Sequence, residues 1–219
     1  SLGQLVLFQQ GDRRVAIMDA PLKSPAPLFK TLIKSYQGKR LNSPNDGAYD
    51  RFGNLYFTDP AYGLKEQLLD PRKELTFQGI YKVTPKGSLI LLDKTEKFPN
   101  GIGISPDNQT LYVAVSDESR PVWLAYDIRV DGTISNKRVF LDSSIHNPNK
   151  DKGVPDGMAV HSSGAIFATG PNGVWLLNAN GRLLAKIHTG KLTANCTLST
   201  DEKKLFITAH DSLLVIELK

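Results

Sequence analysis

Short apolar runs separated by polar turns recur along the whole chain, and they repeat in groups of four. From Asn100 the runs read GIGIS, TLYVAVS, WLAYDIR and KRVFLD, and from Asp156 they read GMAVHS, AIFATG, GVWLLNA and RLLAKIH. Gly, Pro, Asn and Asp lie between these β-rich runs, whereas helical periodicity is nearly absent. The pattern predicts an all-β protein assembled from four-stranded units.

Four stretches share one order of turn and strand. NDGAYDRFGNLYFTD begins at Asn45, NGIGISPDNQTLYVAVSD at Asn100 and DGMAVHSSGAIFATG at Asp156; in the fourth, CTLSTDEKKLFITAHD, the same position falls on Ala194. The three polar positions are 55 and 56 residues apart. Common propeller repeats have roughly 40 to 50 residues, so we expect insertions in the loops, with KEQLLDPRKELTFQ and SSIHNPNKDKGV as the candidates.

The two ends of the chain each carry an incomplete unit. LVLFQQ, RVAIMDA and LFKTLI are typical of the second to fourth strands of a blade, and CTLS, KLFITA and SLLVIEL of the first three strands of another. The pattern therefore predicts one domain over residues 1–219, a six-bladed β-propeller lacking its N-terminal blade in this chain, with about five blades, two of them partial. A smaller ring closed by the two partial sheets is the alternative.

One face of this propeller is predicted to hold the chemistry. In an antiparallel blade the innermost strand begins on the face where its neighbour ends, so Asn45, Asn100 and Asp156 should share a face. Repeats stacked about an axis would bring these positions together, and three amide or carboxylate oxygens form a site for a hard cation. For each residue alone, a role in forming the turn is the preferred interpretation, but their coincidence at equivalent repeat positions favours a shared site. We expect the same face to carry Asp59, Tyr62, Ser116, Asp117, Gly170, Asn172, His210 and Asp211.

Composition and charge exclude several classes of function. The net charge is +5, but Lys and Arg are interleaved with acidic residues, which argues against a nucleic-acid footprint. A single cysteine, Cys196, excludes an internal disulfide and a multi-cysteine zinc site. No apolar run could span a membrane, and no GxSxG, phosphate-loop or dinucleotide motif occurs. Compartment and oligomeric state are left open.

The motifs SPND, PNG and PDG, in this order and each ahead of a short strand, resemble those of the gluconolactonase, senescence-marker-protein and luciferin-regenerating-enzyme family. The resemblance runs from about Gly3 to the C-terminus. It implies a six-bladed propeller that binds one divalent cation and hydrolyses lactones or related esters. It also implies that Asn45, Asn100 and Asp156 are the metal ligands, together with a first-blade glutamate in an EGP-type motif that this chain does not contain.

The resemblance implies a metal-dependent lactone hydrolase acting on a small-molecule lactone or ester. Asp156 would bind the metal and act as general base, and Asp46 would assist catalysis and bind substrate hydroxyls. Calcium is the preferred ion because every inferred ligand is an oxygen, with zinc and magnesium as alternatives. Residues expected to line the substrate pocket are Tyr62, Gln78 and His210.

Two other functions are compatible with the same sequence. A phosphoester hydrolase acting on organophosphates would use the same cation, and a non-catalytic propeller with a structural calcium would bind a partner through its loops. Arg40 could bind a sugar-acid carboxylate, but an exposed surface arginine is the preferred interpretation. An arginine that some relatives carry two residues before the first Asn ligand is Ser43 here.

Overall fold

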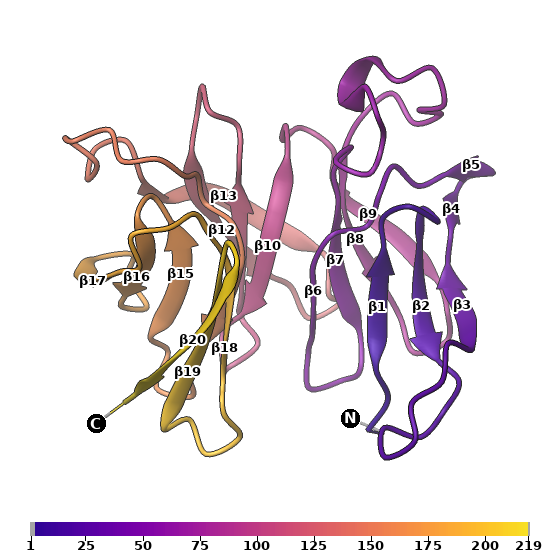
Figure 1. Cartoon of the computed structure of the whole chain (residues 1–219). Coiled ribbons are helices and arrows are strands. Elements are labelled where there is room, and N and C mark those ends of the chain that lie inside the picture. Colours follow the sequence, from indigo (N-terminus) through magenta and orange to yellow (C-terminus); the bar gives the residue numbers. More distant parts are fainter. Residues whose placement is uncertain (1–2, 219) are drawn as a thin grey trace. The chain divides into compact units, whose positions relative to one another are not determined.

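A computed structural model describes residues 3–218, and their regular structure is β apart from one 3-10 turn, Gln67–Leu69 (Figure 1). The contacts within the chain divide it into two compact units, Ser1–Pro99 and Asn100–Lys219. The single domain expected over residues 1–219 stays a prediction.

The first unit contains two antiparallel sheets and a small hairpin. β1 (Val6–Gln9), β2 (Arg14–Met18) and β3 (Phe29–Ile33) form a three-stranded sheet, and β4 (Ser35–Tyr36) pairs with β5 (Lys39–Arg40). The four-stranded sheet consists of β6 (Gly47–Tyr49), β7 (Leu55–Asp59), β8 (Gly79–Val83) and β9 (Leu89–Asp93).

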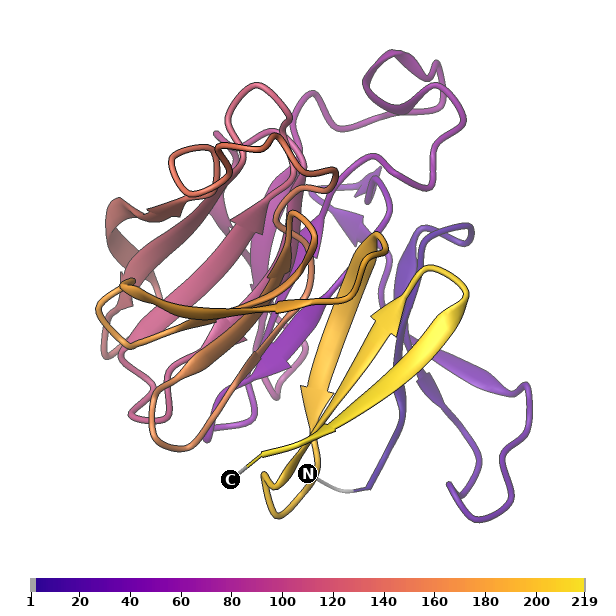
Figure 2. The ribbon, with the colours of Figure 1, turned by 60° about the vertical axis from the view of Figure 1, so that its left-hand side comes forward.

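The second unit contains three antiparallel sheets, seen from a second direction in Figure 2. The first consists of β10 (Pro99–Ile104), β11 (Thr110–Val115), β12 (Val122–Ile128) and β13 (Ile134–Asp142). The next consists of β14 (Met158–Val160), β15 (Ile166–Gly170), β16 (Gly173–Leu177) and β17 (Leu183–His188). The last consists of β18 (Thr193–Leu198), β19 (Lys204–Ala209) and β20 (Ser212–Glu217).

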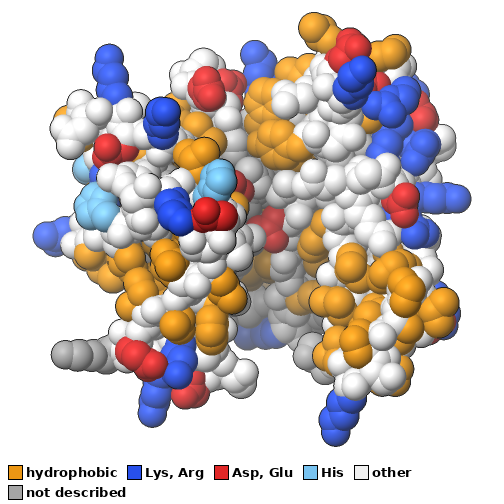
Figure 3. Space-filling model, viewed as in Figure 1, with side chains coloured by type: hydrophobic (Ala, Val, Ile, Leu, Met, Phe, Trp, Pro, Cys, Tyr) orange, Lys and Arg blue, Asp and Glu red, His pale blue; other side chains and the backbone are white. Residues whose placement is uncertain are grey.

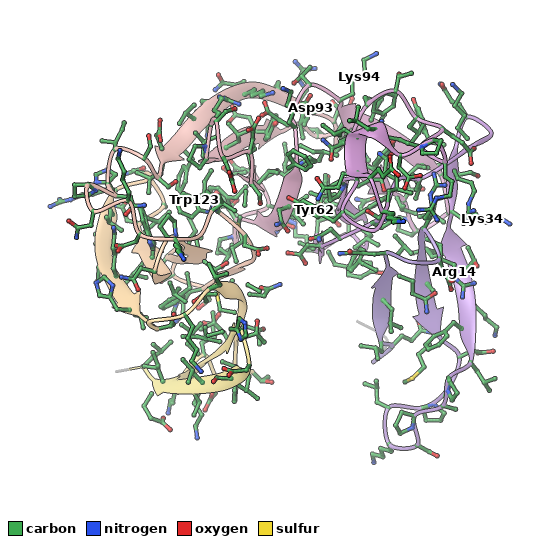
Figure 4. The ribbon with its side chains drawn as sticks, turned by 45° about the horizontal axis from the view of Figure 1, so that its top comes forward. Arg14, Lys34, Tyr62, Asp93, Lys94 and Trp123 are labelled. Atoms are coloured by element: carbon green, nitrogen blue, oxygen red, sulfur yellow. The ribbon has the colours of Figure 1, made fainter. Side chains whose placement is uncertain are left out.

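The second and third strands of the four-stranded sheets form the core of each unit. β7, β8 and β11 are almost wholly buried, whereas the outer strand β13 is largely exposed or half-buried. Strands buried on both faces read as continuous apolar runs, as TLYVAV in β11 does. In the second unit Trp123, labelled in Figure 4, packs against Trp175 with ring centroids 5.3 Å apart and both rings buried.

The repeat seen in the sequence is confirmed by the turns. The hairpin after the first strand closes in the same way in four sheets, with an N–H donating to the carbonyl three residues earlier and the donor residue at positive φ. A positive φ favours Gly and tolerates Asn, which explains two glycines and one asparagine among the four donors. The four donor and acceptor pairs are Gly53 and Asp50, Asn108 and Ser105, Gly164 and His161, and Glu202 and Ser199.

All predicted strands of the complete units are present, and two details differ from expectation. The strand predicted as CTLS begins earlier, at Thr193. The β4–β5 hairpin was not predicted; Gln37 (φ 49°) and Gly38 (φ 80°) form its two-residue turn with positive φ at both positions, which matches the twist of the paired strands. Only one of these residues is a glycine, so the turn signal in YQGKR is weak.

The surface is mixed in character. On the face in Figure 3, Lys and Arg side chains lie dispersed among acidic and uncharged ones, while hydrophobic side chains gather over the part of the first unit that contains β1–β3. Leu5, just before β1, and Leu22 and Leu28, between β2 and β3, are exposed large apolar residues of the first unit. Within residues 3–218 there is no helix with the length and apolarity needed to cross a bilayer.

Gly101→Ala should destabilise the second unit because no space exists for a side chain. An ideal Cβ on Gly101 would lie 2.1 Å from the backbone oxygen of Asp156 and 2.7 Å from the Cα of Gly157. Relief requires backbone movement, and we expect a loss of about 1–3 kcal/mol in the free energy of unfolding. Urea unfolding measures it. The matched control is Gly11→Ala, where nothing lies within 4 Å of the added Cβ; equal midpoints for the two variants would contradict the close approach.

Candidate active site

Asn45 lies at the end of a tightly held loop in the first unit. Its backbone N–H donates to the carbonyl of Thr58 at 3.0 Å, which places it beside β7 at the entrance to β6. The residue is half-buried, and within residues 3–218 its carboxamide makes no hydrogen bond. The side-chain oxygen is therefore available to bind a ligand such as a cation.

The loop before Asn45 is organised by the buried carboxylate of Asp59. One oxygen of Asp59 accepts the backbone N–H of Asn42 at 2.8 Å and its side-chain N–H at 3.1 Å, and the other accepts the N–H of Ser43 at 2.8 Å. Asp59 is completely buried. The hydroxyl of Ser43 extends the attachment by donating to the Pro60 carbonyl at 2.6 Å. Asn45 is thus presented by a loop whose conformation Asp59 imposes.

Arg13 supplies the positive charge in this buried network. Its Nε donates to the carbonyls of Leu41 and Asn42 at 2.7 and 3.1 Å, and its side chain is 6% exposed. Burial raises the pKa of Asp59 to about 7, against the opposing effects of the Asn42 and Ser43 N–H groups and of the Arg13 charge. The buried carboxyl therefore binds a proton at a pH where exposed aspartates are ionised.

The segments that contain Asn100 and Asp156 pack against each other in the second unit. Asn100 is 6% exposed, and its side-chain Nδ2 donates to the hydroxyl of Ser116 at 2.9 Å. The N–H of Asp156 donates to the carbonyl of Thr169 at 3.0 Å, the same bond that Asn45 makes to Thr58. The backbone of Asp156 lies directly against Gly101. The structure therefore brings these two predicted ligand segments together, while the convergence of all three stays a prediction.

Asp46 has a structural counterpart in Asn195. The backbone N–H of each donates to a threonine hydroxyl on the adjacent strand, at 3.3 and 3.1 Å, and Oδ1 of each accepts the next N–H at 2.8 Å. Asn195 follows Ala194, which confirms that Ala194 occupies the position of Asn45 in the last sheet. Asn195 makes these hydrogen bonds although Ala194, the residue before it, has no side-chain oxygen. The hydrogen bonds of Asp46 to Thr58 and Gly47 are therefore part of the turn. The catalytic and substrate-binding role of Asp46 stays a prediction.

The predicted pocket residues occupy different environments. Tyr62, labelled in Figure 4, is half-buried and stacks on Phe98 with ring centroids 5.6 Å apart. Gln78 is 4% exposed, and its amide oxygen accepts the N–H of Ala61 at 2.8 Å. His210 is exposed, with its Nδ1 3.9 Å from a carboxylate oxygen of Asp211. Their contact with substrate stays a prediction.

Arg40 is an exposed surface arginine, as the preferred interpretation of the sequence predicted. Its Nη2 donates to the carbonyl of Asp12 at 3.0 Å, and its backbone N–H donates to Glu74 at 2.8 Å. Both partners lie in the first unit, and the side chain is exposed. Its guanidinium is thus partly engaged in holding a turn.

The donor set fits a hard cation only if amide oxygens take part. In the described part of the chain, no three His, Cys, Asp or Glu side chains lie together as metal ligands. Asn45 and Asn100 would contribute neutral oxygens and Asp156 a carboxylate, which matches the ligand preferences of calcium and magnesium better than those of zinc. The half-buried, unbonded carboxamide of Asn45 is the observation that favours the fit.

The residues that hold the ligand loops had no role in the sequence-based prediction. Asp59 and Ser116 were expected on the ligand face without a function, and Arg13 and Asn42 were not singled out. No local pattern marks them, because each acts on a segment 16 or more residues away. The one available signal is a polar residue at the end of an otherwise apolar strand.

The antiparallel sheets place the chain in the class of β-propeller proteins. Residues 4–211 match the family described as SMP-30/Gluconolactonase/LRE-like region. The chain belongs to this family, which confirms the resemblance expected from its motifs.

Known relatives agree with the family assignment. The gluconolactonase of Zymomonas mobilis subsp. mobilis is 29% identical, over 99% of this chain and 61% of its own length. The diisopropyl-fluorophosphatase of Loligo vulgaris is 28% identical, over 82% of this chain and 58% of its own length. This chain thus spans about three fifths of the length of the curated relatives it matches.

A solved structure establishes the fold. A gluconolactonase from Xanthomonas campestris matches with a TM-score of 0.85 and 33% identity, covering 99% of this chain and 69% of that protein. The five sheets described above are therefore blades of a β-propeller. The six-bladed closure and the missing N-terminal blade stay predictions.

Asp59 should make stability fall as the pH rises. Its pKa is raised from 3.8 in an unfolded chain to about 7 in the fold, so the unfolded chain loses this proton first. The contribution to stability is complete below about pH 4 and is lost as the pH rises to about 7, at about 1.4 kcal/mol per pH unit. Asp59→Asn has no such group, so the unfolding free energy of the wild type relative to this variant should decrease over that range.

Urea unfolding between pH 4 and 8 measures this difference. Asp12→Asn, at an exposed turn of the same unit, serves as the control. The difference in unfolding free energy between the wild type and this variant should not decrease steadily between pH 4 and 7. A constant difference between the wild type and Asp59→Asn would contradict the raised pKa.

Proposed function

We propose that the protein containing this chain is a metal-dependent lactone hydrolase that opens gluconolactone-like sugar lactones or related esters. The observation that carries the proposal is the close packing of Gly101, which follows Asn100, against the backbone of Asp156 in one unit, with Asn45 at the equivalent repeat position in the other. Family membership supports the reaction class. Calcium is the proposed ion, with zinc and magnesium as alternatives.

The cation would be held by the side-chain oxygens of Asn45, Asn100 and Asp156. When bound, it supplies Lewis-acid polarisation of the lactone carbonyl and stabilises the negative charge that develops on the carbonyl oxygen. Two neutral amides and one carboxylate leave net positive charge on a divalent ion, as this chemistry requires.

Asp156 is the proposed general base. Its carboxylate would accept a proton from the attacking water while the water oxygen forms a bond to the carbonyl carbon. The ester bond between that carbon and the ring oxygen then breaks, and the ring oxygen regains a proton to leave a hydroxy acid. Asp46, next to the first ligand, would orient substrate hydroxyls, and Tyr62, Gln78 and His210 would line the pocket.

Asp156→Asn should abolish lactone opening in the full-length protein. The change keeps the size of the side chain and one oxygen but removes the base, so we expect kcat to fall by about 10²-fold or more. A pH-indicator assay with a sugar lactone measures turnover, before and after treatment with a chelator and re-addition of Ca²⁺. Asp131→Asn, at an exposed turn of the same unit, is the matched control.

Activity that survives both the chelator and Asp156→Asn would refute the mechanism. If Ca²⁺ raises the unfolding temperature but no lactone or ester is turned over, the protein is a binding module with a structural cation.

Organophosphate hydrolysis is the second candidate reaction, and the similarity to the diisopropyl-fluorophosphatase of Loligo vulgaris favours it. The same cation would polarise a phosphoryl oxygen instead of a carbonyl. A substrate panel separates the two: acid release from sugar lactones against fluoride release from an organophosphorus fluoride. We expect kcat/KM to be higher for the lactone, and a higher value for the fluoride would reverse the assignment.

A further inference from the structure

Ser116 forms a bridge between the segments that carry Asn100 and Asp156. The residue directly follows β11 and is half-buried. Its hydroxyl accepts a hydrogen bond from Nδ2 of Asn100 at 2.9 Å and donates one to the carbonyl of Pro155 at 2.6 Å. Pro155 immediately precedes Asp156, so a single hydroxyl contacts both predicted ligand segments.

The bridge determines which way the Asn100 amide faces. A serine hydroxyl has one proton to donate, and a carbonyl oxygen can only accept, so this proton is used on Pro155. The Asn100 atom facing Ser116 must therefore be the nitrogen, because the amide oxygen would meet an oxygen without a proton to offer. Oδ1 of Asn100 is consequently the amide atom directed away from Ser116.

The bridge also fixes the peptide that leads into Asp156. The Pro155 carbonyl is held by Ser116 and the N–H of Asp156 by the Thr169 carbonyl at 3.0 Å, so both polar groups of this peptide are bonded. On the other side of Asp156, the hydroxyl of Thr169 in β15 donates to the carbonyl of Gly157 at 2.9 Å. The bond to the Pro155 carbonyl, by contrast, comes from Ser116 in the neighbouring sheet β10–β13.

We propose that Ser116 is a positioning residue that sets the cation affinity of the site by orienting Asn100 and Asp156 together. This inference rests on the proposed function, since it takes both residues as ligands. Losing a hydrogen-bond partner of a metal ligand typically costs 10- to 100-fold in metal affinity, because the ligand must then be ordered when the ion binds.

Isothermal titration calorimetry of the metal-free, full-length protein tests this proposal. Ca²⁺, Mg²⁺ and Zn²⁺ are titrated separately, and the ion that the wild type binds most tightly is used for the variants. Ser116→Ala should bind it about 10- to 100-fold more weakly. Ser116→Thr keeps the hydroxyl and should retain wild-type affinity. The matched control is Ser119→Ala, which removes a nearby exposed hydroxyl that bonds Asp117.

The outcomes separate this inference from the proposed function. If the wild type binds an ion and Asp156→Asn weakens binding while Ser116→Ala does not, the role of Ser116 is overturned and the proposed site stands. If the wild type binds none of the three ions, the proposed site itself fails. Urea unfolding of the metal-free variants measures any purely structural effect of the substitutions on stability.

A folding defect in Ser116→Ala would not prevent the test. Ser116→Cys keeps the volume of the side chain but offers only a weak hydrogen-bond donor and acceptor, so it should also weaken ion binding. Wild-type affinity in the cysteine variant would overturn the role assigned to Ser116.

Discussion

The close approach of inner strands is the constraint on which the second unit depends. The backbone oxygen of Asp156 lies where a side chain on residue 101 would begin, and Asn195 fills the corresponding space beside Gly157. Only glycine permits such contact without moving the backbone. This packing brings the starts of successive inner strands of the second unit next to one another.

Polar anchors at the ends of second strands complete this arrangement. In the first unit the anchor is Asp59, a buried carboxylate that accepts three N–H bonds from the loop before Asn45. In the second unit it is Ser116, a neutral hydroxyl that contacts two segments. A buried charge requires compensation, which Arg13 and the N–H groups provide, whereas a hydroxyl requires only one donor and one acceptor. The two anchors therefore differ in their dependence on pH.

The side chains near the starts of the inner strands are used in different ways. Asp46 and Asn195 show that the local turn consumes a side-chain oxygen to cap its own backbone. Asn45 follows a loop that Asp59 holds, and the side-chain nitrogen of Asn100 is held by Ser116. The roles of Asn45 and Asn100 as cation ligands belong to the proposed function.

Much of the fold could be predicted because it depends on local patterns. Short apolar runs, turn residues and the recurrence of Asn45, Asn100 and Asp156 predicted the β class, the strand order and the equivalence of Ala194 with these three positions. The roles of Asp59, Ser116 and Arg13 were decided by tertiary structure alone. Their partners lie far away in the chain, and whether a buried polar side chain has a partner depends on three-dimensional packing that no sequence period encodes.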